Sequence, residues 1–372
     1  MQVHILGTSS SRPAHGRSVS GSVVNTNKGI IVVDCGEGFQ ERFVKHNKIL
    51  KNKNSKYRIK SGKINTILLT HGHLDHTWGL LPLLKTLSLD GREKELTVIA
   101  PTLDIIVERI LQSDSVAIKV EDIDVANVDI YNQYLQWWSL GGTTEELNYR
   151  VNWILVGVDK NDDINKLNAI SINPNRGQIE VVNDLSKFTN GIKIVNIPTL
   201  HSVPSCGWWI KEPDRRGKFD SEKARRNNLS VEQIKKLVNG EKIDGFSPKE
   251  FMMESKKNPS VLISGDTAGK NPGFRKFSNT NYETSVLIHE ATFLQINKDR
   301  AEKYFHSTAL EAAKNAKLIG AKQLIITHFS SRIKDTKLLS SEAIEAFERV
   351  HAACDSDVIV IEGEEIKINS YP

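Results

Sequence analysis

The stretch Thr70-His71-Gly72-His73-Leu74-Asp75-His76 directly follows an apolar run at residues 64–69. The length and β-branched content of that run are typical of a buried strand. Three imidazoles and a carboxylate thus lie within six residues, where a strand gives way to a loop. Because neutral imidazole and carboxylate groups are ligands for zinc-like metals, the stretch predicts a metal site at a strand end.

The order of these residues favours two metals. Side chains alternate along an extended chain, so His71 and His73 point to the same side. Asp75 and His76 turn back from the loop that follows. One metal can bind His71 and His73, while another metal a few ångström away binds Asp75 and His76. With only eleven histidines in 372 residues, chance clustering explains the stretch poorly.

Length and composition describe an ordinary soluble globular protein. A chain of 372 residues with 39% apolar and 26% charged residues can bury a large core, as one domain or two. Its first residues run directly into a strand without signal-peptide features, and no apolar run approaches the roughly 20 residues of a membrane helix. The scattered Cys35, Cys206 and Cys354 form no CxxC pair, which argues against a disulfide framework. We therefore expect a cytoplasmic protein without a membrane partner.

The net charge of +5 is unevenly distributed along the chain. Residues 45–63 hold eight Lys or Arg and no acid, and residues 211–226 hold seven against four acids. Residues 119–163 reverse this balance, with nine acids against three bases. The first basic run ends just before the histidine-bearing strand, and positive potential near a metal site suits a polyanionic substrate.

Other apolar strands also run into residues of metal-binding type. In layered α/β proteins, sites form outside the carboxyl ends of strands, so such residues can meet although they are far apart in sequence. Together with His71, they predict one metal centre. The strands and residues are 191–197 before His201, 261–263 before Asp266, and 323–326 before His328.

Asp34 lies in a glycine-rich turn, Asp34-Cys35-Gly36-Glu37-Gly38, before a helix expected to start near Gln40. Its carboxylate could cap that helix, which is the commoner role. It could instead be the partner of a metal-ligating histidine. Both roles are open at this stage.

The acidic stretch that extends to about residue 185 has the weakest pattern. Strands are expected only at 153–158 and 179–182, and its tryptophans, Trp137, Trp138 and Trp153, are expected in the core. Further along, helices are expected over residues 233–238, closed by Gly240, and over residues 342–351.

Several short motifs follow one another along the chain: Leu6-Gly7-Thr8-Ser9, DCGEG at 34–38, HSVP at 201–204, SGDT at 264–267, HEATF at 289–293, HSTA at 306–309 and THFSSR at 327–332. Together with THGHLDH they resemble the metallo-β-lactamase superfamily and, within it, the ribonuclease Z family of tRNA 3′-processing endonucleases. The resemblance covers about residues 1–102 and 190–334. It implies an α/β fold, a four-layer αββα metallo-β-lactamase sandwich with the metals at one edge. We expect a single domain over 1–372, with a probable acidic insertion at 112–186 and a probable basic, helical substrate-binding arm at 211–258.

The resemblance also implies roles for individual residues. Two divalent ions are expected, zinc by default with manganese or iron as alternatives. Asp75 would also orient the attacking water and accept its proton. His306 would contact the scissile phosphate or protonate the leaving oxygen, and Glu290 would either orient His306 or be structural. The implied ligands are His71, His73 and His201 for the first metal, Asp75, His76 and His328 for the second, and Asp266 between them.

Two features depart from the family pattern. Ribonuclease Z usually has His-Leu-His-Gly-Asp-His where this chain has His-Gly-His-Leu-Asp-His. The family's arm carries a Gly-Pro-rich signature, which the helical, basic segment here lacks. Such a segment can still grip phosphates, since backbone contact needs charge more than sequence. The residues expected to bind substrate are Lys211, Arg215, Arg216, Lys218 and Arg332. For the insertion we expect dimer packing or a lid, because its negative charge argues against RNA contact.

Three functions remain in competition. The leading hypothesis is a metal-dependent endoribonuclease that removes 3′ trailers from precursor tRNA as a homodimer. The alternative enzyme is a small-molecule phosphodiesterase, for example for cyclic nucleotides; the missing Gly-Pro arm favours it, whereas the basic runs and THFSSR favour RNA. A binding protein with a degenerate site is the third class, and the complete ligand set argues against it.

Overall fold

The computed structural model describes residues 1–118, 120, 123–159, 163–214, 217–243, 245–253 and 257–371. These residues form two compact units. The larger comprises Met1–Glu212 together with Pro259–Pro372, and the smaller comprises Pro213–Asn258. None of the helices in the described ranges combines the length and the hydropathy that crossing a bilayer requires.

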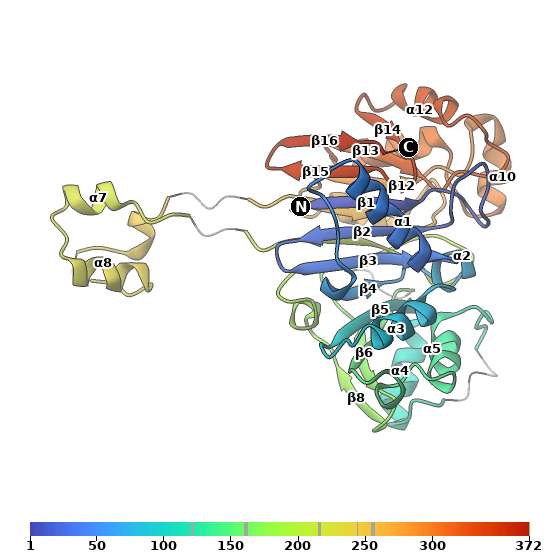
Figure 1. Ribbon diagram of the computed structural model, residues 1–372, viewed down its shortest axis with the longest axis horizontal. Helices are drawn as coiled ribbons and strands as arrows, with labels where there is room; N and C mark the ends of the chain where they lie inside the picture. Colours follow the sequence, from blue (N-terminus) through green and yellow to red (C-terminus); the bar gives the residue numbers. More distant parts are fainter. Residues whose placement is uncertain are drawn as a thin grey trace. The chain divides into compact units, whose positions relative to one another are not determined.

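Two β-sheets lie face to face within the described part of the larger unit (Figure 1). The first sheet has the order β16 (Glu365–Asn369), β15 (Val358–Glu362), β1 (Gln2–Gly7), β2 (Gly21–Thr26), β3 (Gly29–Cys35), β4 (Ile64–Leu68), β5 (Leu96–Thr102), β6 (Val151–Gly157), β7 (Ala169–Asn173) and β8 (Gln178–Val181). The second has the order β14 (Val350–Ala352), β13 (Gln323–Thr327), β12 (Val286–Glu290), β11 (Ser260–Ile263), β10 (Cys206–Lys211) and β9 (Lys193–Pro198). Strands β3 to β6 and strands β11 to β14 are parallel neighbours.

The main core lies between the two sheets. Val3, Ile31 and Ile154 of the first sheet belong to the same buried cluster as Trp208 and Ile263 of the second. Because neighbouring side chains alternate along a strand, the other face of each sheet must be covered by helices. Helices α1 (Phe39–Asn52), α3 (Leu80–Leu89), α4 (Asp104–Ser113) and α5 (Ile130–Ser139) cover the first sheet. Helices α9 (Pro272–Ser278), α11 (Ala309–Leu318) and α12 (Lys337–Ile344) cover the second. The predicted four-layer αββα sandwich is confirmed.

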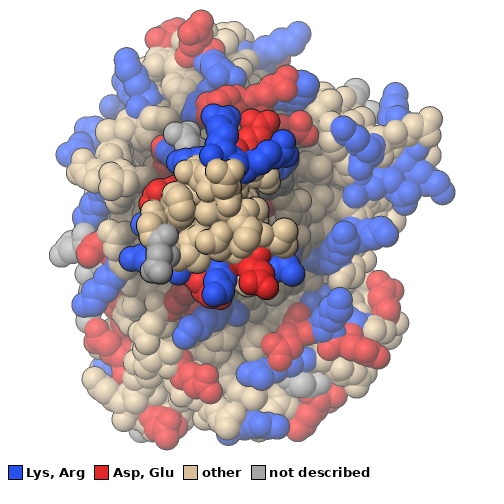
Figure 2. Space-filling view, turned by 90° about the vertical axis from the view of Figure 1, so that its left-hand side faces the viewer, with Lys and Arg blue, Asp and Glu red and all other residues tan. Residues whose placement is uncertain are grey.

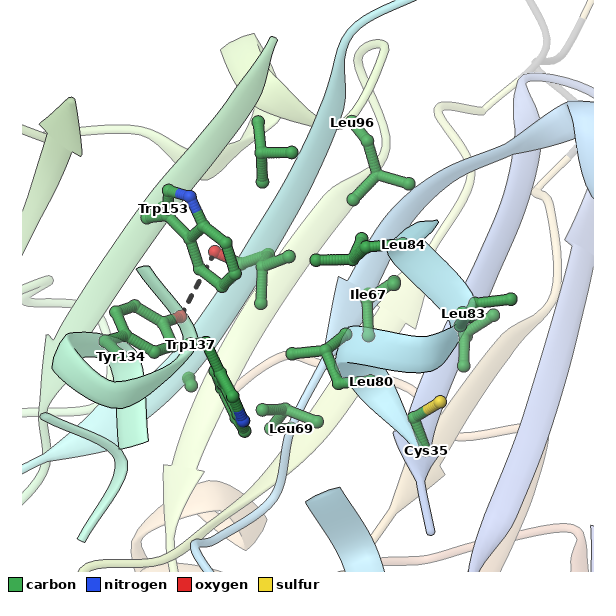
Figure 3. Close-up of a cluster of buried hydrophobic side chains, with 14 of the residues drawn as sticks. Cys35, Ile67, Leu69, Leu80, Leu83, Leu84, Leu96, Tyr134, Trp137 and Trp153 are labelled. Atoms are coloured by element: carbon green, nitrogen blue, oxygen red, sulfur yellow. Dashed lines mark hydrogen bonds between the residues drawn. The ribbon is translucent and has the colours of Figure 1, made fainter. Parts of the chain in front are cut away.

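The acidic stretch contributes to this core more than its sequence indicated. Figure 3 shows Tyr134 and Trp137 of α5 packed with Trp153 of β6, and Trp138 packs against the same cluster. The Tyr134 hydroxyl donates a hydrogen bond of 3.1 Å to the Ile154 carbonyl. The tryptophans are therefore core residues, as expected.

Two secondary-structure predictions were wrong. The acidic stretch contains strand β7 and helix α5, which we did not predict. Strands β6, β7 and β8 extend the first sheet. They form because pairing with neighbouring strands outweighs the weak local sequence pattern. The helix predicted over residues 342–351 instead lies at α12, where Leu339 and Ala343 supply the buried face. Residues 350–352 form β14 because they pair in parallel with β13.

The smaller unit is a compact helical segment. Helices α7 (Ser221–Arg226) and α8 (Val231–Val238) pack around a small core that includes Leu237 and Phe251. A capping box at Ser230 starts α8, and Gly240, with a φ of +89°, follows its end. The helix predicted over 233–238 is confirmed.

Candidate metal centre

The metal loop, residues 70–77, follows β4 at its carboxyl end. His71 and His73 converge, with 3.0 Å between His71 Nε2 and His73 Nδ1. The chain then forms the single-turn helix α2 (Leu74–Thr77), which carries Asp75 and His76. The predicted convergence of the first two histidines is thus present in the structure.

His201 and Asp266 complete a first ligand set. His201 follows β9, and its Nε2 atom lies 3.1 Å from His73 Nδ1. Asp266 follows β11, and its Oδ2 atom lies 3.7 Å from His71 Nε2 and 4.0 Å from His201 Nε2. One ligand atom from each of these four residues lies within 4.8 Å of every other.

A second ligand set lies beside the first. His328 follows β13, and its Nε2 atom lies 3.3 Å from His76 Nε2. Asp75 Oδ2 lies 3.6 Å from His76 Nε2 and 3.5 Å from His328 Nε2. Asp266 Oδ2 also lies 3.5 Å from His76 Nε2, so this carboxylate stands between the two sets.

The donor chemistry of both sets fits divalent cations. Imidazole nitrogens face one another at hydrogen-bond distance, where a cation can take their lone pairs. Burial lowers the pKa of His71 well below its usual value, which keeps the ring neutral and able to coordinate. Burial alone raises the pKa of Asp266, but the charges of His328 and His76 outweigh it and lower the pKa well below its usual value. Among the described residues the buried Asp266 Oδ1 atom has no hydrogen-bond partner, and it lies 3.3 Å from His328 Nδ1.

The second ring nitrogen of four histidine ligands is held by a neighbouring oxygen. A ligating imidazole is normally oriented in this way, because the partner fixes the ring and its tautomer. These contacts leave the Nε2 atoms directed at the centre. The contacts are His71 Nδ1 to Thr70 Oγ1 at 3.1 Å, His76 Nδ1 to Asp34 Oδ2 at 2.7 Å, His201 Nδ1 to the Phe305 carbonyl at 2.9 Å, and His328 Nδ1 to Thr292 Oγ1 at 3.1 Å.

Asp34 holds the metal loop rather than a helix. Its carboxylate accepts hydrogen bonds from the Thr70 backbone N–H at 2.8 Å and from the Thr70 hydroxyl at 2.9 Å, besides contacting His76. Helix α1 begins after Gly38 with no side-chain cap in the described structure. Of the two roles left open by the sequence, the structure supports that of histidine partner.

His306 and Glu290 form a pair at the edge of the centre. His306 Nδ1 lies 2.8 Å from Glu290 Oε1 and 4.0 Å from Asp266 Oδ2. Burial lowers the pKa of His306, but the Glu290 charge and hydrogen bond, followed by the Asp266 charge, raise it overall to about 9. Glu290 is 1% exposed and also accepts hydrogen bonds from the backbone of Thr267 and Ser307. Glu290 therefore both contacts His306 and fixes the loops that carry Thr267 and Ser307.

Comparisons with known proteins find similar sequences and similar folds. Residues 16–100 match the model of the metallo-β-lactamase superfamily. Over these residues the chain resembles that superfamily. It is 29% identical to the ribonuclease Z of Listeria monocytogenes over 373 residues, which cover 97% of this chain and 99% of that protein. It is 28% identical to the ribonuclease Z of Bacillus subtilis, covering 95% of this chain and 97% of that protein.

Solved structures share the metallo-β-lactamase fold. The short form of human tRNase Z superposes with a TM-score of 0.57 at 22% identity, covering 97% of this chain and 100% of the human chain. A long-form RNase Z from yeast gives a TM-score of 0.59 at 19% identity, covering 98% of this chain and 42% of the yeast chain. At these identities the likeness shows a common fold.

An open cavity of about 720 Å³ gives access to this candidate metal centre. Arg12, Arg300 and Arg332 line it. The proposed ligands His73, Asp75, His201 and Asp266 also line it, as does His306. Arg332 was predicted from the sequence. The other two arginines were not, because nothing in their local sequence links them to the site. The Ser11 backbone N–H donates to Asp75 Oδ2 at 2.8 Å.

Of the other predicted substrate-binding residues, Lys211 is the one that belongs to the described part of the larger unit. Lys211 pairs with Lys193 at the start of β9, the end of that strand away from His201. Lys218 belongs to the smaller unit. Arg215 and Arg216 lie outside the described residues.

The acidic stretch supplies a contact to the metal loop that the sequence did not reveal. Gln133 of α5 is buried, and its side-chain amide donates to the carbonyls of Gly72 at 2.5 Å and of Val128 at 2.7 Å. Its Oε1 atom accepts from the Thr77 hydroxyl at 2.7 Å. A Cβ atom on Gly72 would lie 1.7 Å from the Val128 carbonyl oxygen. The glycine found where ribonuclease Z usually has leucine thus has a local steric cause.

Proposed function

We propose that this chain is a ribonuclease Z-type endoribonuclease that removes 3′ trailers from tRNA precursors and leaves a 3′-hydroxyl on the tRNA. The observation that carries the proposal is the His306–Glu290 pair beside two ligand sets with Asp266 between them. A cavity with three arginines reaches residues of both sets and His306. The similarity to ribonuclease Z over nearly the whole chain supports this choice of substrate.

The metals would be held by the two sets described above, with His71, His73 and His201 in one and Asp75, His76 and His328 in the other. When bound, two such cations activate water and stabilise the attacking and leaving oxygens of a phosphodiester. Nitrogen and oxygen donors of this kind favour zinc.

The residues of the chain direct the proton transfers. Asp75, held by the Ser11 N–H, orients the attacking water and accepts its proton. Water forms the new bond to phosphorus while the bond from phosphorus to the 3′ oxygen of the tRNA breaks. His306, protonated through its contact with Glu290, donates a proton to that leaving 3′ oxygen. The trailer leaves with a 5′-phosphate, which balances the hydrolysis.

Basic residues would bind the rest of the RNA. The three arginines of the cavity suit the phosphates on either side of the scissile bond, because a guanidinium can bind phosphate through two parallel hydrogen bonds. The basic segment with Lys211, Arg215, Arg216 and Lys218 is proposed to hold the RNA backbone at a distance from the cut.

A direct comparison of substrates tests the proposal. The zinc-loaded protein is incubated with a precursor tRNA bearing a 3′ trailer and, in parallel, with a cyclic nucleotide. We expect release of the trailer and a 3′-hydroxyl on the tRNA product. Cleavage of the cyclic nucleotide alone would replace the proposal with that of a small-molecule phosphodiesterase.

Three finer points belong to the same proposal. The metal is zinc, which elemental analysis of the purified protein tests. The active species is a homodimer, which sedimentation analysis tests. The protein is cytoplasmic, consistent with free thiols at Cys35, Cys206 and Cys354, and cell fractionation tests this.

A further inference from the structure

A second cavity, of about 550 Å³, lies at the opposite end of the first sheet from the metal centre. Ile64, Thr97 and Asn152 line it, and they stand at the starts of the parallel strands β4, β5 and β6. The metal loop follows the other end of β4. At about 3.3 Å per strand residue, the two sites are about 20 Å apart along the sheet. We call this cavity the amino-end groove.

The lining of the amino-end groove is strongly basic. Figure 2 views the side of the molecule on which the β2–β3 turn lies, where basic and acidic side chains are intermixed. Among the described lining residues, six are cationic and one is acidic. That acid, Glu95, lies 3.6 Å from Arg150, which offsets its charge. The cationic residues are Lys28, Lys63, Arg92, Lys94, Arg150 and Lys187.

The groove is assembled from segments far apart in sequence. Lys28 lies in the β2–β3 turn, Lys63 in η1 (Ser61–Lys63), and Lys187 in η2 (Leu185–Phe188). Arg92 is held in place, because its Nη2 atom donates to the Glu95 carbonyl at 2.6 Å and its guanidinium lies 5.3 Å from the Tyr149 ring centroid. A fixed set of like charges that folding brings together raises the local potential for an anionic ligand.

One wall of the groove is tied to the point where the chain leaves for the smaller unit. Glu212 is the last residue of the larger unit before that segment, and its carboxylate is buried. It accepts hydrogen bonds from the Asn27 backbone N–H at 2.9 Å and from the Asn27 side chain at 3.1 Å. Asn27 itself lines the groove. Glu212, at the end of the larger unit, is therefore fixed to the β2–β3 turn that carries Lys28.

From this placement we propose that the amino-end groove binds the phosphate backbone of the RNA substrate at a distance from the scissile bond. The proposal rests on the RNA substrate of the proposed function and adds a contact surface to it. About 20 Å is short compared with a duplex of roughly 16 base pairs, the length that double-stranded RNA-binding domains span, so one structured RNA can reach both sites.

Matched charge-removal variants test the groove. The groove variant carries Lys28→Ala, Lys63→Ala and Lys187→Ala. The control variant carries Lys314→Ala, Lys317→Ala and Lys337→Ala, which removes the same charge from exposed positions on α11 and α12. Binding of labelled mature tRNA, which has no trailer to cleave, is measured by fluorescence anisotropy between about 50 and 200 mM salt. Hydrolysis of bis(p-nitrophenyl) phosphate reports whether the metal centre is intact.

We expect the groove variant to bind tRNA on the order of tenfold more weakly at the lowest salt, with a salt slope about 2–3 smaller. The control variant should match the wild type, and all three proteins should hydrolyse the small diester equally. Equal losses of tRNA affinity in the groove and control variants, or an unchanged salt slope in the groove variant, would overturn the proposal. Tripolyphosphate binding to the same proteins is measured as well. If the groove variant loses tripolyphosphate binding but keeps tRNA binding, the groove binds a small anion and the proposal is overturned.

Failure of the groove can be separated from failure of the proposed function. Cleavage of precursor tRNA by the wild type tests the function alone. If the wild type cleaves and the groove variant keeps the wild-type KM and salt slope, only the groove is refuted. If the wild type neither cleaves nor binds tRNA, both are refuted.

Discussion

Replacing Gln133 with leucine removes three hydrogen bonds at the metal loop while keeping a side chain of similar size. The wild-type amide donates to the carbonyls of Gly72 and Val128 and accepts from Thr77. Gly72 lies between two of the proposed ligands, so these bonds fix the backbone from which both imidazoles project. Gln133 is therefore a positioning residue for the metal centre, supplied by the acidic stretch.

The size of the effect follows from the number of groups left unpaired. Leucine leaves two buried carbonyls without their donor, and each such group costs about 1–3 kcal/mol. The Thr77 hydroxyl keeps a contact of 3.3 Å with the His73 carbonyl, so it adds little. We expect the free energy of unfolding to fall by roughly 2–4 kcal/mol. Loss of loop support should weaken metal affinity by about 10–100-fold, as for other partners of metal ligands.

Two assays separate these effects, and the same helix supplies a control. Urea unfolding of the metal-free protein gives the stability change, and competition with a chromophoric chelator gives the metal affinity. Gln136→Leu makes the same substitution at an exposed position of α5 and should leave both quantities near wild type. If Gln133→Leu binds metal as tightly as Gln136→Leu, the positioning role is refuted, even if the protein is less stable.

Three further predictions follow from the contacts described above. Asp34→Asn keeps an acceptor for Thr70 but removes the charge beside His76, so metal affinity should fall by about 10–100-fold in chelator competition. Unchanged affinity together with a lower unfolding free energy would make Asp34 purely structural. His306→Ala should lower the cleavage rate by about 10²–10⁴-fold with both metals retained in elemental analysis, and loss of metal would contradict the role given to His306. His4 and His46 form a buried pair with 2.9 Å between their ring nitrogens, and burial lowers the pKa of His4 to about 3 and of His46 to about 4. Below about pH 6.5 these two histidines therefore bind protons in the unfolded chain but not in the folded chain. As the pH falls, each histidine lowers the free energy of unfolding by about 1.4 kcal/mol per pH unit. Urea unfolding of the metal-free protein at pH 7 and pH 5 should show that loss in the wild type and a smaller loss in the His4→Leu, His46→Leu variant, whereas equal losses would refute the assignment.

The chemistry of the metal loop could be read from the sequence because it is local. Imidazoles and a carboxylate within six residues are metal ligands wherever the loop lies, and a strand end exposes them. His201, Asp266 and His328 could be added because each follows an apolar strand. The motif series extended these expectations to the αββα sandwich, which the structure confirms.

Contacts between distant segments could not be read in this way. His76 and His328 meet across 252 residues, and Asp34 reaches His76 across 42. The sequence left the role of Asp34 open because a carboxylate before a helix more commonly caps that helix. Only the parallel pairing of β3 with β4 brings that carboxylate to Thr70 and His76.

The metal-ligand chemistry was thus determined by the sequence, because the type of a side chain fixes what it can coordinate. The tertiary structure decided which residues support and surround the centre. Gln133 comes from a stretch whose pattern gave no helix. Arg12 reaches the cavity from a loop, and Arg300 reaches it from helix α10 (Lys298–Lys303). The lysines of the amino-end groove come from separate turns and 3₁₀ segments at the starts of neighbouring strands. Their proximity depends on sheet pairing and register, which are properties of the packed chain rather than of any one segment.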